Sequence, residues 1–259
     1  MRLLIAAVFF ALLVAATERG RPAFASVPGL WRRQLLAGAA IAAYNLAFFA
    51  GVRLAGVAAG TLVGIGSGPL FAGVLQALIT RRVPVGLWWL GTALAIAGGA
   101  AIALGNGGAA STDATGLLLC LAAGFSYAVY TLTAKSLSVH ATPARASAWV
   151  FATAAVIALP AAWALVPSGP ADLAAAGWRT WLVVGWLGVV ATGVSYLLFT
   201  TALRFISGAT GVALALAEPL TAFTLAVQLL GEPLRASGLA GIALVMAGLA
   251  LVVTAERRA

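Results

Sequence analysis

Charged residues, histidine and cysteine are all scarce in this sequence of 259 residues. Asp, Glu, Lys and Arg together make up 8% of the chain, against about a quarter of an average soluble protein. So few charged side chains cannot cover the surface of a soluble domain of this size, which excludes that class. With one histidine (His140) and one cysteine (Cys120), the chain can form no internal disulfide and lacks the usual ligands of a zinc site. We therefore expect no metal and no cofactor.

Hydrophobic residues make up 63% of the sequence and occur in blocks separated by short polar connections. Most blocks hold 18 to 24 residues, and a helix of about 20 residues crosses the hydrocarbon core of a bilayer. The sequence therefore predicts an all-α polytopic membrane protein with nine transmembrane helices. The predicted segments are 3–16, 34–52, 56–79, 87–104, 116–134, 146–166, 181–203, 207–230 and 237–254.

The fifteen lysines and arginines divide unevenly between the two sides of the membrane that these segments define. Eleven lie on one side and four on the other, and cytoplasmic loops retain positive charge. We therefore predict a plasma-membrane protein with a cytoplasmic C-terminus and an outside N-terminus. Because the basic residues form no stripe, the net charge of +9 does not predict nucleic-acid binding. The eleven are Arg19, Arg21, Arg32, Arg33, Arg81, Arg82, Lys135, Arg145, Arg204, Arg257 and Arg258; the four are Arg2, Arg53, Arg179 and Arg235.

The first apolar segment has a second interpretation. Met1 and Arg2 followed by an apolar run resemble a secretory signal peptide. Four arginines follow the run within seventeen residues, and a loop with this charge resists translocation, which favours a membrane helix. Fourteen residues cover only about 21 Å, however, which is short for a span. We therefore expect a further apolar segment upstream of Met1.

The second to fourth segments resemble the seventh to ninth. The two copies are offset by five segments, an odd number, so they run through the membrane in opposite directions. An inverted repeat of this kind is typical of secondary transporters. A five-plus-five arrangement needs ten helices, and this chain supplies four plus five, in repeats assigned to 1–106 and 114–256. The matching pairs, 150 to 152 residues apart, are Tyr44 with Tyr196, Arg53 with Arg204, Gly60 with Gly211, Pro69 with Pro219, Gly91 with Gly241, and Gly98 with Gly248.

Three stretches of the second half resemble the closing part of an EamA-type repeat of the drug/metabolite transporter superfamily. They are Ala217-Glu-Pro-Leu, Leu229-Leu-Gly-Glu-Pro-Leu and Gly238-Leu-Ala-Gly-Ile-Ala-Leu-Val-Met-Ala-Gly. The first copy, Ile65-Gly-Ser-Gly-Pro-Leu-Phe-Ala-Gly, is similar but lacks the acid before its proline. The resemblance implies a ten-helix fold with a central pathway between the repeats, and export of small metabolites or amino acids.

Glu218 lies near the middle of segment 207–230. A carboxylate there costs about 2.5–3.5 kcal/mol unless it faces the protein interior or water. At about 100° per residue, Glu218 shares one helix face with five other polar side chains. We interpret this stripe as the wall of an aqueous path, in which Glu218 contacts a polar or cationic substrate group or binds a coupled proton. Alternatively, Glu218 only satisfies polar groups near Pro219. The stripe comprises Ser207, Thr210, Glu218, Thr221, Thr224 and Gln228.

Other residues predict how the helices bend and pack. Pro69 and Pro219 fall near the middle of long segments at corresponding positions, which predicts paired helix interruptions at the binding region; the alternative is two kinks for packing. Four glycines spaced by four predict close helix packing, and tryptophans near segment ends predict interfacial anchors. The glycines are Gly56, Gly60, Gly64 and Gly68, and the tryptophans are Trp88, Trp89, Trp149, Trp178 and Trp181.

Polar side chains inside apolar segments define the predicted substrate pathway. Tyrosines suit this role because they offer both aromatic surface and a hydroxyl. The pathway residues are Tyr44, Asn45, Ser67, Pro69, Gln76, Tyr127, Tyr130, Tyr196, Glu218, Pro219, Thr221 and Gln228.

These observations predict a secondary transporter that exports small metabolites, amino acids or related compounds by alternating access between two inverted repeats. An enzyme is disfavoured because Glu218 is the one carboxylate at mid-membrane and has no partner base. The alternative is a channel-like or structural membrane subunit, although no ring of like groups is visible. The predicted partners are the lipid bilayer and a small-molecule substrate, and we also consider a coupling proton or other ion and a homodimer.

Overall fold

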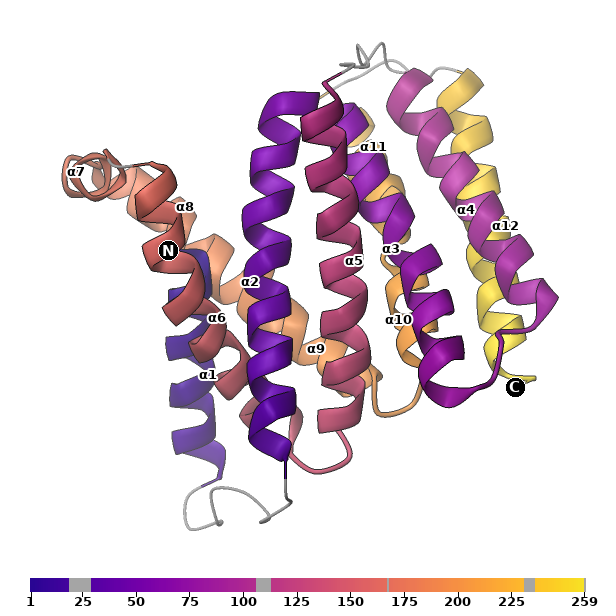
Figure 1. Ribbon diagram of the computed structural model, residues 1–259. Coiled ribbons are helices and arrows are strands. Elements are labelled where there is room, and N and C mark those ends of the chain that lie inside the picture. Colours follow the sequence, from indigo (N-terminus) through magenta and orange to yellow (C-terminus); the bar gives the residue numbers. More distant parts are fainter. Residues whose placement is uncertain (19–28, 106–112, 167, 231–235, 259) are drawn as a thin grey trace. The chain divides into compact units, whose positions relative to one another are not determined.

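The structure is a computed structural model, and it describes residues 1–18, 29–105, 113–166, 168–230 and 236–258. All regular secondary structure in these residues is helical (Figure 1). Eight helical segments are long and apolar enough to cross a membrane, and α1 (Arg2–Thr17) is apolar but shorter. The predicted all-α polytopic membrane protein is therefore confirmed. Each of the nine predicted segments matches a helical segment, although α1 falls short of a full span.

Two predicted segments are subdivided in the structure. The predicted segment 181–203 corresponds to α8, a π-helix (η1) and α9, which together cover 178–202. The predicted segment 207–230 corresponds to α10 and α11, which are separated by a turn. A short additional helix, α7, precedes α8. The helices after α1 are α2 (Leu30–Ala55), α3 (Val57–Thr80), α4 (Gly86–Gly105), α5 (Ala114–Leu137), α6 (Pro143–Leu165), α7 (Gly169–Ala174), α8 (Trp178–Gly188), η1 (Val189–Val194), α9 (Ser195–Ala202), α10 (Gly208–Leu214), α11 (Ala217–Leu230) and α12 (Ala236–Glu256).

Several helix ends are fixed by local side chains. Thr142 is the N-cap of α6, where its hydroxyl accepts a hydrogen bond from the backbone N–H of Arg145. Ser207 caps α10 in the same way through the N–H of Thr210. Such caps satisfy N–H groups that have no partner within the helix. Between α2 and α3 the chain turns at Gly56, whose φ of 82° favours glycine.

The chain forms two compact units, each built from segments of both halves of the sequence. Unit 1 comprises 1–46 and 132–205, and unit 2 comprises 47–131 and 206–259. In unit 1, α1 packs on α6, α8 and η1. Gly188 and Gly193 provide a surface without side chains against Ile5 and Phe9 of α1, which lets the backbones approach closely.

Unit 1 also contains a nearly buried ion pair that we did not predict. The carboxylate of Glu18, directly after α1, lies 3.0 Å from the guanidinium of Arg145 on α6. The hydroxyl of Thr142 donates a second bond to the same carboxylate. Arg19, the residue after Glu18, and Arg145 were counted on the same side of the membrane, and the contact of Glu18 with Arg145 agrees with that placement.

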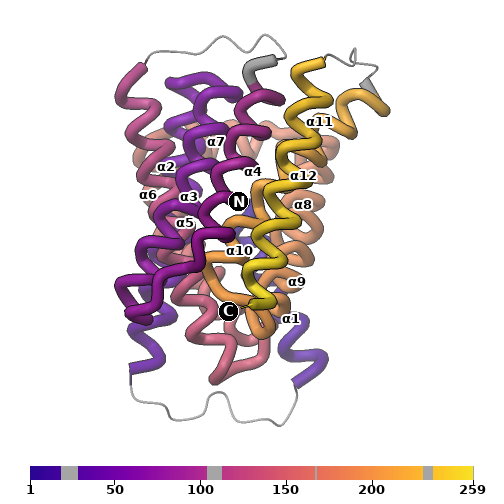
Figure 2. The backbone as a smooth tube through the Cα atoms, turned by 90° about the vertical axis from the view of Figure 1, so that its right-hand side faces the viewer, coloured from indigo at the N-terminus to yellow at the C-terminus, as the bar shows by residue number. Residues whose placement is uncertain are grey.

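In unit 2, α4 and α12 have the most extensive helix contact, and they run side by side in Figures 1 and 2. A Cβ atom added at Gly91 would lie 2.6 Å from the carbonyl oxygen of Gly248, and one at Gly98 would lie 2.6 Å from that of Gly241. In the other direction, a Cβ atom at Gly248 would lie 2.5 Å from the carbonyl oxygen of Gly91, and one at Gly241 would lie 2.7 Å from that of Gly98. The contact is reciprocal, because Gly91 and Gly98 match Gly241 and Gly248 in the sequence repeat. Each helix therefore presents the same glycines to the other, as in a two-fold symmetric interface.

The glycine-spaced face of α3 packs as predicted at three of its four positions. Gly60 and Gly64 contact Val52 and Phe48 of α2, and Gly68 contacts Val212 of α10. The prediction is wrong for Gly56, where an added Cβ would meet nothing within 4 Å. Gly56 instead supplies the positive φ of the turn before α3.

Candidate functional site

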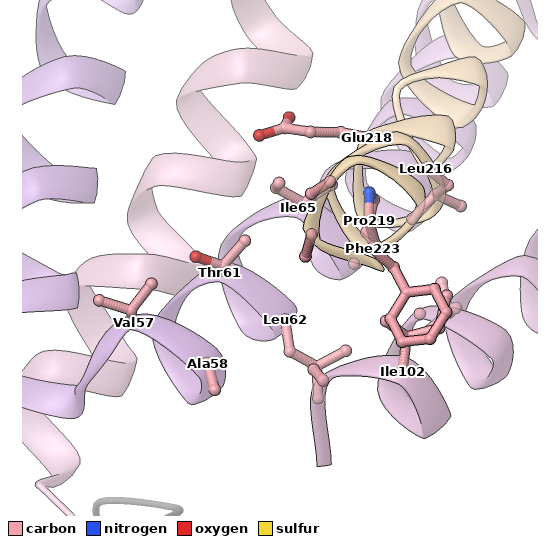
Figure 3. Close-up of a pocket in the computed structure, with 16 residues that line it drawn as sticks. Val57, Ala58, Thr61, Leu62, Ile65, Ile102, Leu216, Glu218, Pro219 and Phe223 are labelled. Atoms are coloured by element: carbon pink, nitrogen blue, oxygen red, sulfur yellow. The ribbon is translucent and has the colours of Figure 1, made fainter. Parts of the chain in front are cut away.

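Unit 2 contains a pocket of about 300 Å³ between the first half of α3, the second half of α4 and the start of α11 (Figure 3). Its wall is mainly apolar and includes Ile65 of α3, Ile102 of α4 and Phe223 of α11. Two polar side chains, Thr61 and Glu218, also line it. A mainly apolar pocket with a few polar groups is the usual form of a small-molecule site, and this volume is at the small end of the range.

The turn between α10 and α11 places Glu218 at the pocket. Regular helix stops after Leu214 and starts again at Ala217, and the N–H of Glu218 donates to the carbonyl of Ala215. Pro219 therefore stands in the first turn of α11, where its missing N–H removes no helix bond. The predicted interruption near Pro219 is confirmed, three to four residues upstream of the proline.

The matching interruption predicted at Pro69 is wrong, because Pro69 lies inside the unbroken helix α3. Proline cannot donate a hydrogen bond to the carbonyl four residues earlier, which belongs to Ile65. The helix continues nonetheless, since Pro69 is buried, and Gly68 before it and Gly73 after it pack against other helices. Packing of the whole segment overrides the local preference of one residue.

Glu218 is the one ionisable side chain of the pocket wall. Its side chain is exposed. In Figure 3 it extends away from Pro219 and Phe223. The carboxylate is therefore at the pocket and accessible, and the aqueous path itself stays a prediction.

The polar stripe predicted on segment 207–230 is wrong as a continuous face, because the turn at 215–216 divides it. Thr221 and Thr224 donate to carbonyls of their own helix, and Gln228 is exposed. Ser207 is the N-cap of α10, and Thr210 lies in its first turn. Both hydroxyls donate to the carboxylate of Glu256 on α12.

These bonds belong to a group of five side chains that we call the α10–α12 cluster: Gln76, Trp88, Ser207, Thr210 and Glu256. The Gln76 side-chain oxygen accepts from the N–H of Ala209 at 2.9 Å, and the indole N–H of Trp88 donates to the Thr210 hydroxyl at 3.1 Å. Gln76, predicted in the pathway, therefore binds the start of α10. The prediction of Trp88 as an interfacial anchor is wrong, because its side chain is 3% exposed.

The other predicted pathway residues lie in both units. In unit 2, Tyr127 and Tyr130 of α5 have ring centroids 6.0 Å apart, and the Ser67 hydroxyl lies where a Cβ at Gly124 would be. In unit 1, the predicted residues are Tyr44, Asn45 and Tyr196. Asn45 accepts a hydrogen bond from Arg2 and donates to the carbonyl of Ile41, and Tyr196 packs edge-on against Phe151.

Three features of the site were missed from the sequence. The apolar pocket wall carries no distinctive sequence pattern in so hydrophobic a chain. Glu256 and Glu18 are at helix ends, and the signal that could have found their partners is a Ser or Thr just before an apolar segment, as at Ser207 and Thr142. Glu232, the acid of the Gly231-Glu-Pro stretch, lies outside the described residues. Within the described part of the chain, no three His, Cys, Asp or Glu side chains are placed to hold a metal ion.

The long apolar helices define the class of this protein, a multi-pass α-helical membrane protein. The model of the EamA-like transporter family matches residues 114–254. The uncharacterized transporter YwfM of Bacillus subtilis (strain 168) is 37% identical over 228 residues, which cover 88% of this chain and 75% of YwfM. The chain therefore belongs to the EamA-like transporter family, as the sequence motifs suggested, and it is a membrane transporter. A protein of known crystal structure shares the fold at 19% identity, with a TM-score of 0.77 over all of this chain and 87% of its own.

Proposed function

We propose that this transporter moves small metabolites, such as amino acids or related compounds, outward by alternating access between two inverted repeats. The observation that carries the proposal is the reciprocal contact of Gly91 with Gly248 and Gly98 with Gly241. Equivalent helices of the two proposed repeats meet there as symmetric partners. Two related conformations that exchange such equivalent parts are the basis of alternating access in inverted-repeat carriers.

The composition of the two units gives further support. Unit 1 contains α1 and α6, which are the first and sixth predicted membrane segments. Unit 2 contains α4 and α12, which are the fourth and ninth. The members of each pair are therefore five segments apart, which is the offset of the repeat. Both pairs are also in direct contact. Each unit therefore holds matching members of the two halves, as an inverted repeat requires.

We propose the pocket of unit 2 as part of the substrate pathway, with Glu218 as the group that contacts a polar or cationic part of the substrate. The apolar side chains of Ile65, Ile102 and Phe223 would contact its hydrocarbon part. In an apolar surrounding a carboxylate attracts a cation or donor more strongly than it does in water. A coupled proton on Glu218 and a homodimer stay predictions of the sequence.

The loop charges support a plasma-membrane orientation with the C-terminus in the cytoplasm. Lys135, Arg145, Arg204 and Arg257 lie at the ends of described helices on the side that the sequence assigns to the cytoplasm, whereas Arg19 and Arg21 are outside the described residues. A reporter fused after Ala259 tests this orientation. Activity only in the cytoplasm is expected, and activity outside the cell would refute it.

Counterflow in proteoliposomes tests the transport mechanism. Vesicles loaded with unlabelled amino acids should take up the same labelled compound with saturable kinetics, and the compound should be recovered unchanged. Glu218→Gln should reduce the uptake of amine-containing substrates at least about tenfold. Asp172→Asn, which removes an exposed carboxylate on α7 far from the pocket residues in sequence, is the control and should have no effect.

Uptake that rises without saturation and shows no counterflow would instead identify the channel-like alternative. A chemically altered product would identify an enzyme. Unchanged kinetics in Glu218→Gln would restrict Glu218 to a structural role beside Pro219.

A further inference from the structure

The α10–α12 cluster joins α10 to three other helices of unit 2, and the carboxylate of Glu256 makes the bonds to α12. One oxygen of Glu256 accepts from the backbone N–H of Ser207 at 2.6 Å, and the other accepts from the Ser207 hydroxyl at 2.8 Å and from Thr210. Gln76 from α3 and Trp88 from α4 complete the cluster. Thr210 and Trp88 are 1% and 3% exposed, so both side chains are buried between α10 and its neighbours.

All partners of Glu256 within the described part of the chain are uncharged donors. Bonds from such donors to a carboxylate are stronger than neutral bonds, but breaking them leaves no unpaired positive charge. The glutamate is half-buried at the last turn of α12, next to the exposed Arg257, and water can reach it. The cluster can therefore open at a lower cost than a buried ion pair.

The cluster and the pocket lie toward opposite ends of the same helices. On α3, Gln76 is ten residues beyond Gly66, the last pocket residue of that helix, or about 15 Å along it. On α4, Trp88 is eight residues before Ile96, the first pocket residue, or about 12 Å. At the pocket Glu218 is exposed, whereas in the cluster Thr210 and Trp88 are buried.

The turn at 215–216 separates α10 from α11. It lies between Thr210 of the cluster and Glu218 of the pocket. The side chains that α10 buries against its neighbours are small, including Ala209 and Ala213 beside Ala72 and Ala255. Small side chains bury little apolar area each, so polar bonds contribute a larger share of the contact.

We propose that Glu256 is a positioning residue for transport: its bonds to Ser207 and Thr210 hold α10 against α12, close unit 2 at the end away from the pocket, and break when that end opens. This inference rests on the proposed alternating access. It assigns the closed end to α10 and the hinge to the turn at 215–216.

Thiol labelling of a buried position on α10 tests the proposal. Val212 is 1% exposed in the core of unit 2, and Val212→Cys introduces a smaller side chain there. In the full-length protein in proteoliposomes, Glu256→Ala should raise the rate at which N-ethylmaleimide labels Cys at 212 about ten- to a hundredfold. Glu256→Gln keeps one acceptor and should give a smaller increase. Thr254→Val, on the same helix with a hydroxyl bonded only within α12, should leave the rate unchanged.

Native Cys120 serves as an internal control in the same molecules. It is fully buried in unit 2, against Gly51 and Gly60 near the pocket end of α3. Faster labelling at position 212 with no change at Cys120 supports the proposal. An unchanged rate at 212 would overturn it, and so would equal increases at both positions, because these indicate general loosening. If Glu256→Ala does not fold, Thr210→Val removes the bond to Glu256 together with the bond from Trp88, and it should raise labelling at 212 severalfold.

Failure of this inference is distinguishable from failure of the proposed function. Wild-type counterflow with unchanged labelling in Glu256→Ala would leave the transport mechanism intact and overturn the role of Glu256. Selective labelling at 212 in a protein that shows no counterflow would leave the contact in place and reject the transport mechanism.

Discussion

In each compact unit, a carboxylate at the end of one helix binds the hydroxyl that caps another. In unit 1, Glu18 after α1 binds Thr142, the cap of α6; in unit 2, Glu256 at the end of α12 binds Ser207, the cap of α10. The difference is the counter-charge, because Glu18 also pairs with Arg145 and Glu256 contacts only neutral donors among the described residues. Two contacts between a carboxylate and a capping hydroxyl can therefore differ greatly in the free energy needed to break them. We expect the contact in unit 1 to be the more rigid of the two.

The largest effect is expected from removing the counter-charge in unit 1. Arg145→Met leaves the carboxylate of Glu18 nearly buried and unpaired, which should lower the free energy of unfolding by about 3–5 kcal/mol. The thermal midpoint of the purified protein in detergent measures this loss. The double variant Glu18→Gln/Arg145→Met should recover most of it, since no charge is then left without a partner. If Glu256→Gln lowers the free energy of unfolding as much as Arg145→Met does, the two contacts are equivalent and the comparison is wrong.

Helix packing also differs between the units. In unit 1, Gly188 and Gly193 face side chains of α1, whereas in unit 2 Gly91 and Gly98 face backbone carbonyls of α12. A side chain can rotate to make room for a new methyl group, but a helix backbone cannot.

An intermediate effect is therefore expected at the α4–α12 contact. Gly98→Ala should force the two helices apart and cost about 1–3 kcal/mol in the thermal unfolding assay. The neighbouring variant Gly99→Ala is the control, because its Cβ would meet only Pro219 at the ordinary distance of 3.7 Å. Gly193→Ala should cost less than Gly98→Ala, since Phe9 can shift. An equal loss in Gly98→Ala and Gly99→Ala would argue against the close contact of α4 and α12.

The sequence was sufficient for the helices and insufficient for the polar contacts. Block length and hydrophobicity located every long helix, because a bilayer demands about 20 apolar residues for each span. The reciprocal pairing of Gly91 and Gly98 with their repeat partners involves residues that the repeat itself had identified. The predicted polar stripe is wrong because a helical-wheel projection assumes one continuous helix. The turn at 215–216, three to four residues before Pro219, divides this segment into two helices. Pro69 shows the opposite case, since the same residue type at the matching position does not break α3.

The smallest effect is expected from one hydrogen bond of the α10–α12 cluster. Trp88→Phe keeps an aromatic ring in the buried site but removes the indole N–H that donates to Thr210, so it should lower the free energy of unfolding by about 1 kcal/mol. Trp89→Phe on the same turn of α4 removes an indole N–H outside the cluster and should cost less. A Trp88→Phe variant as stable as the wild type would show that the bond between α4 and α10 adds nothing to unit 2. A larger loss from Trp89→Phe would show that Trp89 contributes more to the stability of unit 2 than the bond from Trp88 to Thr210.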